Sequence, residues 1–402
     1  MSFDPEAIRS EFPGLAELRD GRPYTYLDSA ATAHKPRCVI ERVAELLGPA
    51  YGTVHRGLYR RAAQMTERYE QARRTVARFL DADPGEIVFT AGCTDALNLV
   101  AHGWGRAHLR PGDRILVSGM EHHAGLVSWH TAGFKPEPIP LRDDGSLDLE
   151  AYDRLLAAGG VKLVGCVHIS NALGTINPVA ELARRAHAAG ALFCLDAAQS
   201  APHLPLSVRA LGCDFLAFAG HKVYGPTGIG VLWARRELLE AMPPWRGGGE
   251  MIERVSFAGT TYAAPPARFE AGTPPFVEAI GLATALEWLM AQDRAAILAH
   301  ERAIYDYAER RLAEVPGLRR IGTAPERGGA LSFVLACAHP ADIAAVLDAQ
   351  HIAIRAGHHC AQPVMERFRV SATARASIAL YTTRADIDRL HDGLQTCVRL
   401  FG

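Results

Sequence analysis

The chain has 402 residues, 49% of them hydrophobic, and a formal net charge of −1. This length and composition allow a large core and more than one domain, and the near-neutral charge offers no global field for nucleic acid or an anionic membrane. No apolar run approaches the roughly 20 residues of a membrane helix and residues 1–12 lack the apolar segment of a signal peptide, so we expect a cytoplasmic globular enzyme.

The N-terminal part contains short elements and one stretch of small side chains. Residues 1–20 include a short helical pattern, and the run at 24–27 ends in Asp28-Ser-Ala-Ala-Thr, as if other groups approach closely there. Apolar positions at helical spacing predict helices over 36–47 and 66–80. Between these helices, His55 and Arg56 are either surface side chains or part of a loop that reaches into an active site.

A strand over 87–90 leads through a glycine-containing turn into a helix expected over 96–104. Free backbone N–H groups at such a helix N-terminus form an anion site. Gly92, Cys93 and Thr94 are therefore candidates for a phosphate cradle. The pattern is weak on its own, because many strand-to-helix turns look alike.

Strands and helices then alternate, with strands at 114–118, 161–169 and 191–195 and a helix opened by Pro178. This alternation predicts a mostly parallel sheet covered on both faces. Ligands bind outside the carboxyl ends of the strands in such sheets. The polar residues expected at those ends are His122, Asn171, Asp196 and Gln199.

Lys222 lies in a turn between two apolar runs, 215–219 and 229–233, which predict neighbouring strands. The turn is rich in Gly, Pro and Thr. Partial burial of the lysine would lower the pKa of its amine, as a Schiff base with an aldehyde cofactor requires. The alternative is a hairpin lysine that faces water.

The C-terminal part predicts a second, α+β domain after a boundary near residue 265. Its expected elements are helices over 279–291, 293–315 with Asp293 as N-cap, 340–350 and after 384, and strands over 331–335 and 352–355. The predicted division is a segment 1–20 that packs on the small domain, a large domain 21–265 and a small domain 266–402.

Pyridoxal 5′-phosphate (PLP) needs a lysine, an acid for its ring nitrogen and a phosphate cradle. Lys222 is the candidate lysine, Asp196 the candidate acid and His122 a partner for the ring face. Asn171 and Gln199 are candidates to hydrogen-bond the phenolic oxygen. The alternatives are a helix cap for Asp196 and an ordinary polar role for His122.

Cys360 lies in a loop-like stretch, RAGHHCAQP, and is expected to be exposed. Nearby imidazoles or Arg355 would raise its thiolate fraction. We expect no metal, because three consecutive residues (His358, His359 and Cys360) rarely close a tetrahedral site. Arg375 is a candidate to hold a substrate carboxylate through a two-pronged pair, or makes a strand-end salt bridge. The eight cysteines contain no C-x-x-C pair, which argues against a disulfide framework.

With these residues in view, the chain resembles the class V, fold-type I PLP enzymes, and within them the Suf-type (group II) cysteine desulfurases and selenocysteine lyases. The motifs that carry the resemblance run from end to end: LDSAAT (27–32), GTVHRG (52–57), MEHHA (120–124), SNALGTINP (170–178), DAAQS (196–200), GHKVYGPTGIG (220–230), GGGEMI (247–252), FEAGTP (269–274), RAGHHCAQP (355–363) and RAS (375–377). The resemblance implies an α/β fold of type I. Its large domain has a mostly parallel sheet between helices, and its smaller C-terminal domain is α+β and carries the Cys360 loop.

The resemblance also implies a role for each matching residue. Those around the cofactor ring would be Lys222 as Schiff-base lysine and proton shuttle, Asp196 as pyridinium partner, His122 as stacking residue, and Asn171 and Gln199 near the phenolic oxygen. Those around the phosphate would be Thr94, His221 and, from the neighbouring subunit, Thr273. Arg375 would bind the substrate carboxylate with help from Asn171 and Arg355, and Cys360 would accept the sulfur.

The implied reaction converts L-cysteine to L-alanine and leaves the sulfur on Cys360 as a persulfide. A homodimer would then pass the sulfur to a Suf-type carrier protein for iron–sulfur cluster assembly, with no nucleic-acid or membrane partner. The alternatives are a selenocysteine lyase acting on L-selenocysteine, a class V aminotransferase or epimerase for which Cys360 is dispensable, and a non-catalytic scaffold.

Three positions depart from the pattern of the resembled family. Ala219 stands where a serine usually binds the phosphate, so that one hydrogen bond is missing. The phosphate turn reads Gly-Cys-Thr where Gly-Thr-Thr is common, which leaves Thr94 as the surer ligand beside Cys93. Pro275 replaces a usual asparagine after Gly-Thr-Pro and weakens the case for the contact from Thr273.

Overall fold

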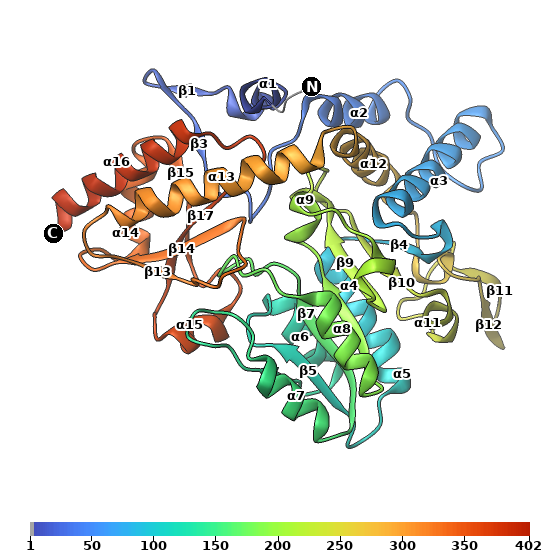
Figure 1. Cartoon of the computed structure of the whole chain (residues 1–402). Coiled ribbons are helices and arrows are strands. Elements are labelled where there is room, and N and C mark those ends of the chain that lie inside the picture. The colour runs from blue at the N-terminus through green and yellow to red at the C-terminus, as the bar shows by residue number, and fades with distance from the viewer. Residues whose placement is uncertain (1–3) are drawn as a thin grey trace.

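A seven-stranded sheet lies at the centre of the larger part of the molecule in the computed structural model, which describes residues 4–402 (Figure 1). In spatial order the strands are β4 (Ile87–Thr90), β10 (Gly230–Ala234), β9 (Phe215–Ala219), β8 (Leu192–Asp196), β7 (Val161–Val167), β5 (Arg114–Ser118) and β6 (Glu137–Ile139). All neighbours are parallel except β10, which runs antiparallel to β4 and β9. The predicted mostly parallel sheet is confirmed, as is the pairing of the two strands that flank Lys222.

The central strands are apolar along their whole length because both of their faces are covered. In β9, Phe215 and Ala217 belong to one hydrophobic cluster, while Leu216 and Phe218 belong to another, and all four are fully buried. Successive side chains of a strand point to opposite faces. The sheet therefore separates two cores, and the unbroken apolar runs in the sequence follow from this arrangement.

Helices cover the sheet and form the layers around it (Figure 1). Those of the larger part are α2 (Arg37–Leu47), α3 (Arg60–Leu80), α4 (Cys93–Leu99), α5 (Arg106–His108), α6 (His123–Ala132), α7 (Leu149–Ala157), α8 (Val179–Ala188), α9 (Ser200–His203), α10 (Val208–Leu211), α11 (Arg236–Ala241) and α12 (Phe276–Met290). Several predicted boundaries were wrong: α12 begins at Phe276 instead of 279, and the strand predicted over 352–355 is divided between two sheets, at Ile352–Ala353 and Arg355–Gly357. α3 begins at Arg60, earlier than predicted, and α4 begins at Cys93 and continues as a π-helix over Val100–Gly105.

A second, antiparallel sheet of four strands lies in the C-terminal part. Its order is β13 (Leu318–Ile321), β14 (Ala330–Leu335), β17 (Thr373–Ser377) and β16 (Arg355–Gly357). The accompanying helices are α13 (Arg294–Ala313), α14 (Pro340–Asp348), α15 (Gln362–Phe368) and α16 (Arg384–Phe401). Asp293 caps α13 as predicted, since its side chain accepts a hydrogen bond from the N–H of Ala296.

The N-terminal segment connects the two parts. The carboxylate of Asp386 in α16 accepts a hydrogen bond from Arg9, in the last turn of the short helix α1 (Pro5–Ser10). Strand β3 (Thr25–Tyr26) pairs with β15 (Ile352–Ala353). These contacts carry the stretch after β3 to the junction of the two sheets. The predicted three-part division of the chain, with boundaries after residues 20 and 265, stays a prediction.

Two short hairpins complete the strands of the described residues: β1 (Leu18–Arg19) with β2 (Arg22–Pro23), and β11 (Ile252–Ser256) with β12 (Gly259–Tyr262). Over residues 4–402, no helix combines the length and the apolar character that crossing a membrane requires.

Candidate active site

A cavity of about 870 Å³ opens at the carboxyl ends of the central strands. It is lined by all four polar residues that the sequence places at those ends, namely His122, Asn171, Asp196 and Gln199. The larger part of the molecule also contributes Lys222, His221, Cys93 and Thr94 to its lining, and the C-terminal part contributes Arg355, Cys360 and Arg375. Thr273 does not line this cavity and is exposed. The structure therefore gathers every predicted site residue except Thr273 around one space.

Lys222 is placed at the cavity by the turn Gly220–Lys222 that follows β9. Burial lowers the pKa of its amine, and the nearby carboxylate of Asp196 opposes this shift. The lysine is therefore a buried amine next to a carboxylate, rather than a hairpin side chain that faces water. An amine with a lowered pKa is suited to condense with an aldehyde and to accept a proton.

Asp196 ends β8 and lies buried in the cavity wall. Its carboxylate accepts hydrogen bonds from the N–H of Ala198 at 2.8 Å and from the thiol of Cys93 at 3.4 Å. Behind it lies Glu121, whose side chain accepts hydrogen bonds from Ser118 and from the N–H of Val167. Burial raises the pKa of Glu121 to about 8, so that this acid is protonated at neutral pH.

His122 caps α6, and its Nδ1 accepts a hydrogen bond from the N–H of Ala124 at 3.1 Å. Burial, reinforced by the positive charge of Lys222, lowers the pKa of His122 to about 4. The ring is therefore neutral at physiological pH and carries its proton on Nε2. A neutral imidazole in the cavity wall offers a flat face to a planar ring.

The predicted phosphate cradle lies where α4 begins. Gly92 is the N-cap of this helix, and a Cβ at Gly230 in β10 would overlap the Gly92 backbone. Position 230 therefore requires glycine, whereas a Cβ at Gly92 would meet no other atom. Thr94 lies in the first turn and lines the cavity together with His221. The buried amine, the carboxylate, the neutral ring and this turn together fit PLP.

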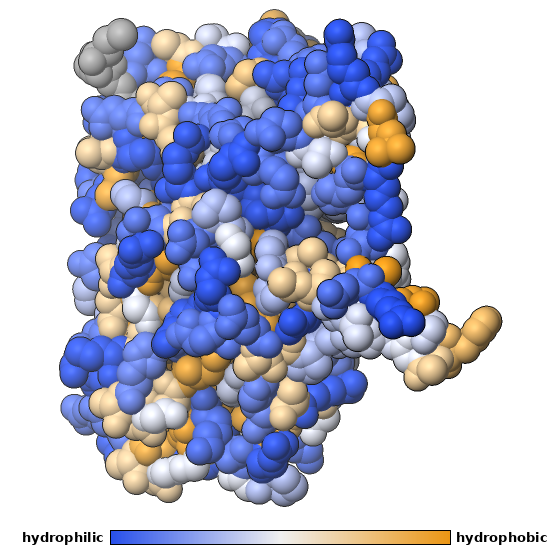
Figure 2. All heavy atoms as spheres, turned by 90° about the vertical axis from the view of Figure 1, so that its right-hand side faces the viewer, coloured by the Kyte–Doolittle hydropathy of each residue, from blue (hydrophilic) through white to orange (hydrophobic). Residues whose placement is uncertain are grey.

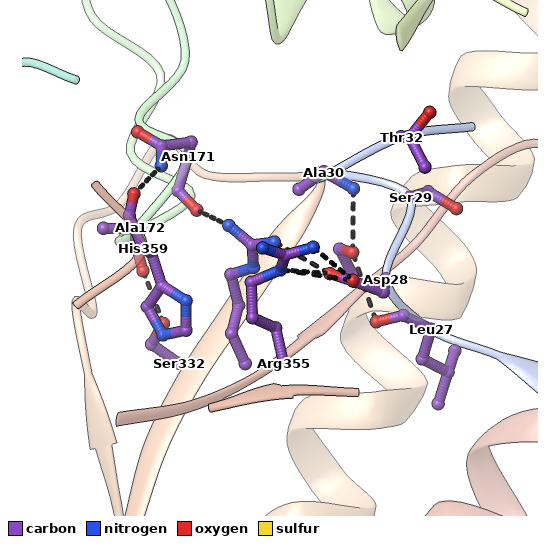
Figure 3. A network of polar contacts seen from close by, with 12 residues as sticks. Leu27, Asp28, Ser29, Ala30, Thr32, Asn171, Ala172, Ser332, Arg355 and His359 are labelled. Atoms are coloured by element: carbon purple, nitrogen blue, oxygen red, sulfur yellow. Dashed lines mark hydrogen bonds and ion pairs between the residues drawn. The ribbon is translucent and has the colours of Figure 1, made fainter. Parts of the chain in front are cut away.

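Arg375 and Arg355 form the far end of the cavity, and both contact a carboxylate that the sequence reasoning missed (Figure 3). Arg375 donates to the Asn171 carbonyl at 2.9 Å and to Asp28 at 2.9 Å, and Arg355 donates to Asp28 at 3.0 Å. Hydrogen bonding to Asp28 raises the pKa of Arg355. One signal was available, since Asp28 is the charged residue in a stretch of small side chains directly after a strand.

Cys360 is exposed, as predicted, whereas the other cysteines are buried or half-buried. Both His359 and Cys360 have left-handed backbone angles, with φ of 53° and 54°. Two backbone hydrogen bonds hold the loop in place. The Cys360 carbonyl accepts from the N–H of His123 at 2.7 Å, and the His359 carbonyl accepts from the side-chain amide of Asn171. The surrounding chain thus presents the thiol at the cavity in a defined conformation.

Two predicted ring contacts have other partners in this structure. The side-chain amide of Asn171 donates to the His359 carbonyl, and that of Gln199 donates to the Ala30 carbonyl at 2.7 Å. Both residues still line the cavity. Their predicted contact with the phenolic oxygen of a cofactor stays a prediction.

Comparisons with known proteins agree along the whole chain. A family model described as aminotransferase class V matches residues 25–390. The whole chain is 49% identical to a probable cysteine desulfurase of Streptomyces coelicolor, of which it covers 98%, and 47% identical to a cysteine desulfurase of Pectobacterium atrosepticum, of which it covers 100%. The crystal structure of the cysteine desulfurase CsdA from Escherichia coli matches with a TM-score of 0.92 at 40% identity, over 100% of both chains. The apo structure of a cysteine desulfurase from Thermococcus onnurineus matches with a TM-score of 0.93 at 38% identity, over 98% of both chains.

Proposed function

This chain belongs to the aminotransferase class V family, and on that premise we propose that it is a PLP-dependent cysteine desulfurase, which converts L-cysteine to L-alanine. One observation carries the proposal: the exposed thiol of Cys360 and the buried amine of Lys222 line the same cavity. An aminotransferase or epimerase needs the lysine but has no use for the thiol. A scaffold needs neither.

The residues around the cavity are suited to hold PLP. Asp196 would pair with the ring nitrogen, His122 would lie against the ring face, and Gln199 would lie near the phenolic oxygen. Thr94, His221 and the turn that contains Cys93 would hold the phosphate at the start of α4. When bound, PLP withdraws electrons from the amino acid and so acidifies its Cα–H bond.

The chain's own groups bind the substrate and move its protons. Arg375, assisted by Arg355 and Asn171, would bind the carboxylate of L-cysteine. Lys222 would take the Cα proton and return a proton, as its lowered pKa permits at neutral pH.

Cys360 would act as the nucleophile for sulfur. Its thiolate forms an S–S bond with the substrate sulfur while the Cβ–S bond breaks, and the electron pair of that bond stays on the carbon fragment. This fragment takes up a proton and leaves as L-alanine, and a persulfide remains on Cys360. The defined conformation of the loop holds the thiol at the cavity for this attack.

We further propose a homodimer in which Thr273 of one protomer completes the phosphate site of the other. Thr273 is exposed and lies outside its own cavity. Figure 2 looks onto the side that carries α3 and the β11–β12 hairpin in Figure 1, where apolar patches interrupt the hydrophilic surface. Leu58, before α3, and Phe257, at the hairpin tip, are fully exposed. Sedimentation velocity tests the dimer.

The sulfur would leave through a Suf-type carrier protein for iron–sulfur cluster assembly. The motif around Cys360 supports this subgroup. We propose a cytoplasmic location, because all eight cysteines are free and free thiols persist in a reducing compartment.

The test is release of L-alanine from L-cysteine, with a thiol reductant present, by wild-type holoenzyme and by Cys360→Ala and Lys222→Ala variants. We expect steady release from the wild type alone, with the visible absorbance of PLP retained in Cys360→Ala. Equal activity in Cys360→Ala would favour a lyase that expels its product directly, as a selenocysteine lyase does. No alanine from any form would reject the desulfurase and direct attention to transamination and epimerisation.

A further inference from the structure

The carboxylate of Asp28 accepts hydrogen bonds from two neighbouring guanidinium groups at one end of the active-site cavity (Figure 3). One oxygen accepts from Arg375 at 2.9 Å, and the other accepts from Arg355 at 3.0 Å. Arg375 is almost completely buried, while the side chain of Asp28 is 15% exposed. Both arginines line the cavity, and Asp28 does not. Asp28 therefore contacts the arginine pair from behind.

The two arginines are brought together by strand pairing. Arg355 in β16 and Arg375 in β17 are direct partners across the antiparallel pair. Like charges at such positions repel each other and destabilise the sheet. A carboxylate at this point offsets the repulsion, and Asp28 provides it from a third segment of the chain.

The backbone holds Asp28 in place independently of its side chain. Asp28 forms a β-bridge with Ser377, which lies two residues after Arg375 on the same strand. The N–H of Ser377 donates to the Leu27 carbonyl at 2.7 Å, and the Ser377 hydroxyl accepts from the N–H of Ala30 at 2.9 Å. A change of the Asp28 side chain would therefore alter charge without releasing the segment.

The two arginines and Asp28 at this end of the cavity have a net charge of one positive unit. Two guanidinium groups face one carboxylate, and Nε of Arg375 is buried without a hydrogen-bond partner. His359, which lies beside them, adds no charge, because burial and Arg375 lower its pKa to about 3. Within the cluster of Arg355, Asp28 and Arg375, one positive charge is thus uncompensated and faces the cavity.

We propose that Asp28 is a specificity-determining residue that matches this site to a single carboxylate, such as that of an α-amino acid, and disfavours dicarboxylates. The inference rests on the proposed function, which assigns the substrate carboxylate to Arg375. Without the negative charge of Asp28, two uncompensated guanidinium groups would attract a second carboxylate. With it, a second carboxylate in the cavity has no uncompensated cation to pair with, and the charge of Asp28 behind the arginines repels it.

The test compares propionate with malonate as probes that carry one and two carboxylates. Their dissociation constants are measured from the change in visible absorbance of bound PLP in the wild type, Asp28→Asn and the double variant Asp28→Asn/Arg355→Gln. We expect the preference for malonate over propionate to rise about tenfold in Asp28→Asn. The variant has one more uncompensated positive charge, and only malonate has a second carboxylate that can pair with it in this partly screened site. The double variant restores the charge balance and should return to the wild-type ratio.

Glu309→Gln serves as the matched control. Glu309 also lies between two arginines, Arg320 and Arg327, but away from the cavity. We expect Glu309→Gln to have the same ratio of malonate to propionate dissociation constants as the wild type. If Asp28 has a purely structural role, Asp28→Asn would weaken the binding of both anions alike and leave the ratio of their dissociation constants unchanged. That result would overturn the proposal.

Circular dichroism and the PLP absorbance identify variants that fold and bind the cofactor. If Asp28→Asn does not fold, the single variant Arg355→Gln tests the proposal instead. It leaves Arg375 and Asp28 as a neutral pair, so its preference for malonate should be lower than that of the wild type. An unchanged ratio in that variant would also overturn the proposal. If the variants change the ratio as expected but the wild type releases no alanine from L-cysteine, the proposed function is rejected and the role of Asp28 is not.

Discussion

The thiol of Cys93 donates a hydrogen bond to Oδ1 of Asp196 across 3.4 Å. Both side chains are buried, and burial, followed by the charge of Asp196, raises the pKa of Cys93 well above its usual value. Cys93 is therefore a neutral donor to the carboxylate and a poor nucleophile. Its position in the cavity wall does not make it a second sulfur acceptor.

Alkylation rates should distinguish Cys93 from Cys360, the two cysteines that line the cavity. In the native holoenzyme, we expect iodoacetamide to modify the exposed Cys360 at least about tenfold faster than Cys93, because reactivity follows thiolate content and access. Peptide mass mapping over time measures both rates, and denatured protein gives the rate of each free thiol. Comparable rates in the native state would contradict the assignment of Cys93 as a buried donor.

Glu121 should make the protein less stable as the pH rises. Burial raises the pKa of this acid to about 8, so that between its unfolded value and pH 8 the folded state binds a proton that the unfolded state has released. In this window the wild type should lose roughly 1.4 kcal/mol of unfolding free energy per pH unit relative to Glu121→Gln, which mimics the protonated acid.

Urea unfolding of the two proteins from pH 5 to pH 8 measures this difference. Ser118 and the N–H of Val167 can donate to the glutamine carbonyl as they do to Glu121, so the variant should fold. A constant difference across the range would mean that Glu121 is ionised in the folded state.

The buried pair of Arg73 and Glu270 should be important for stability. Arg73 donates to both carboxylate oxygens at 2.7 and 2.9 Å, and the N–H of Phe89 in β4 also donates to Glu270. Removing Glu270 leaves the buried Arg73 with the more exposed Glu70 as its remaining ionic partner, so Glu270→Gln should lower the unfolding free energy by about 3 kcal/mol. Urea unfolding measures the loss.

The control for this variant is Glu67→Gln on α3, where Glu67 pairs with Arg74 at the surface. Glu67→Gln should lower the unfolding free energy by no more than about 0.5 kcal/mol, as for other exposed pairs. Equal losses in both variants would show that burial does not govern the Arg73–Glu270 pair.

The central sheet and one wall of the site were readable from the sequence for a physical reason. Strands buried on both faces are continuous apolar runs, as in Phe215–Ala219, and residues after parallel strands meet at one edge. His122 and Asp196 could therefore be placed together without knowledge of any tertiary contact.

The other wall depends on pairings that the sequence does not display. Arg355 and Arg375 become neighbours through the register of β16 and β17, and Asp28 reaches them through a bridge to Ser377. Nothing local to any of these residues indicates that register. Likewise, Glu121 belongs to a recognisable motif, but its burial and raised pKa follow from packing around it.

The most direct test of the account is the location of the sulfur after a single turnover. Wild-type holoenzyme receives less than one equivalent of L-cysteine without reductant, is trapped with an alkylating reagent and is digested for mass spectrometry. We predict one additional sulfur atom on Cys360, in an amount equal to the L-alanine released, and neither product from Cys360→Ser. Sulfur on another cysteine, or undiminished alanine release by Cys360→Ser, would contradict the role of Cys360.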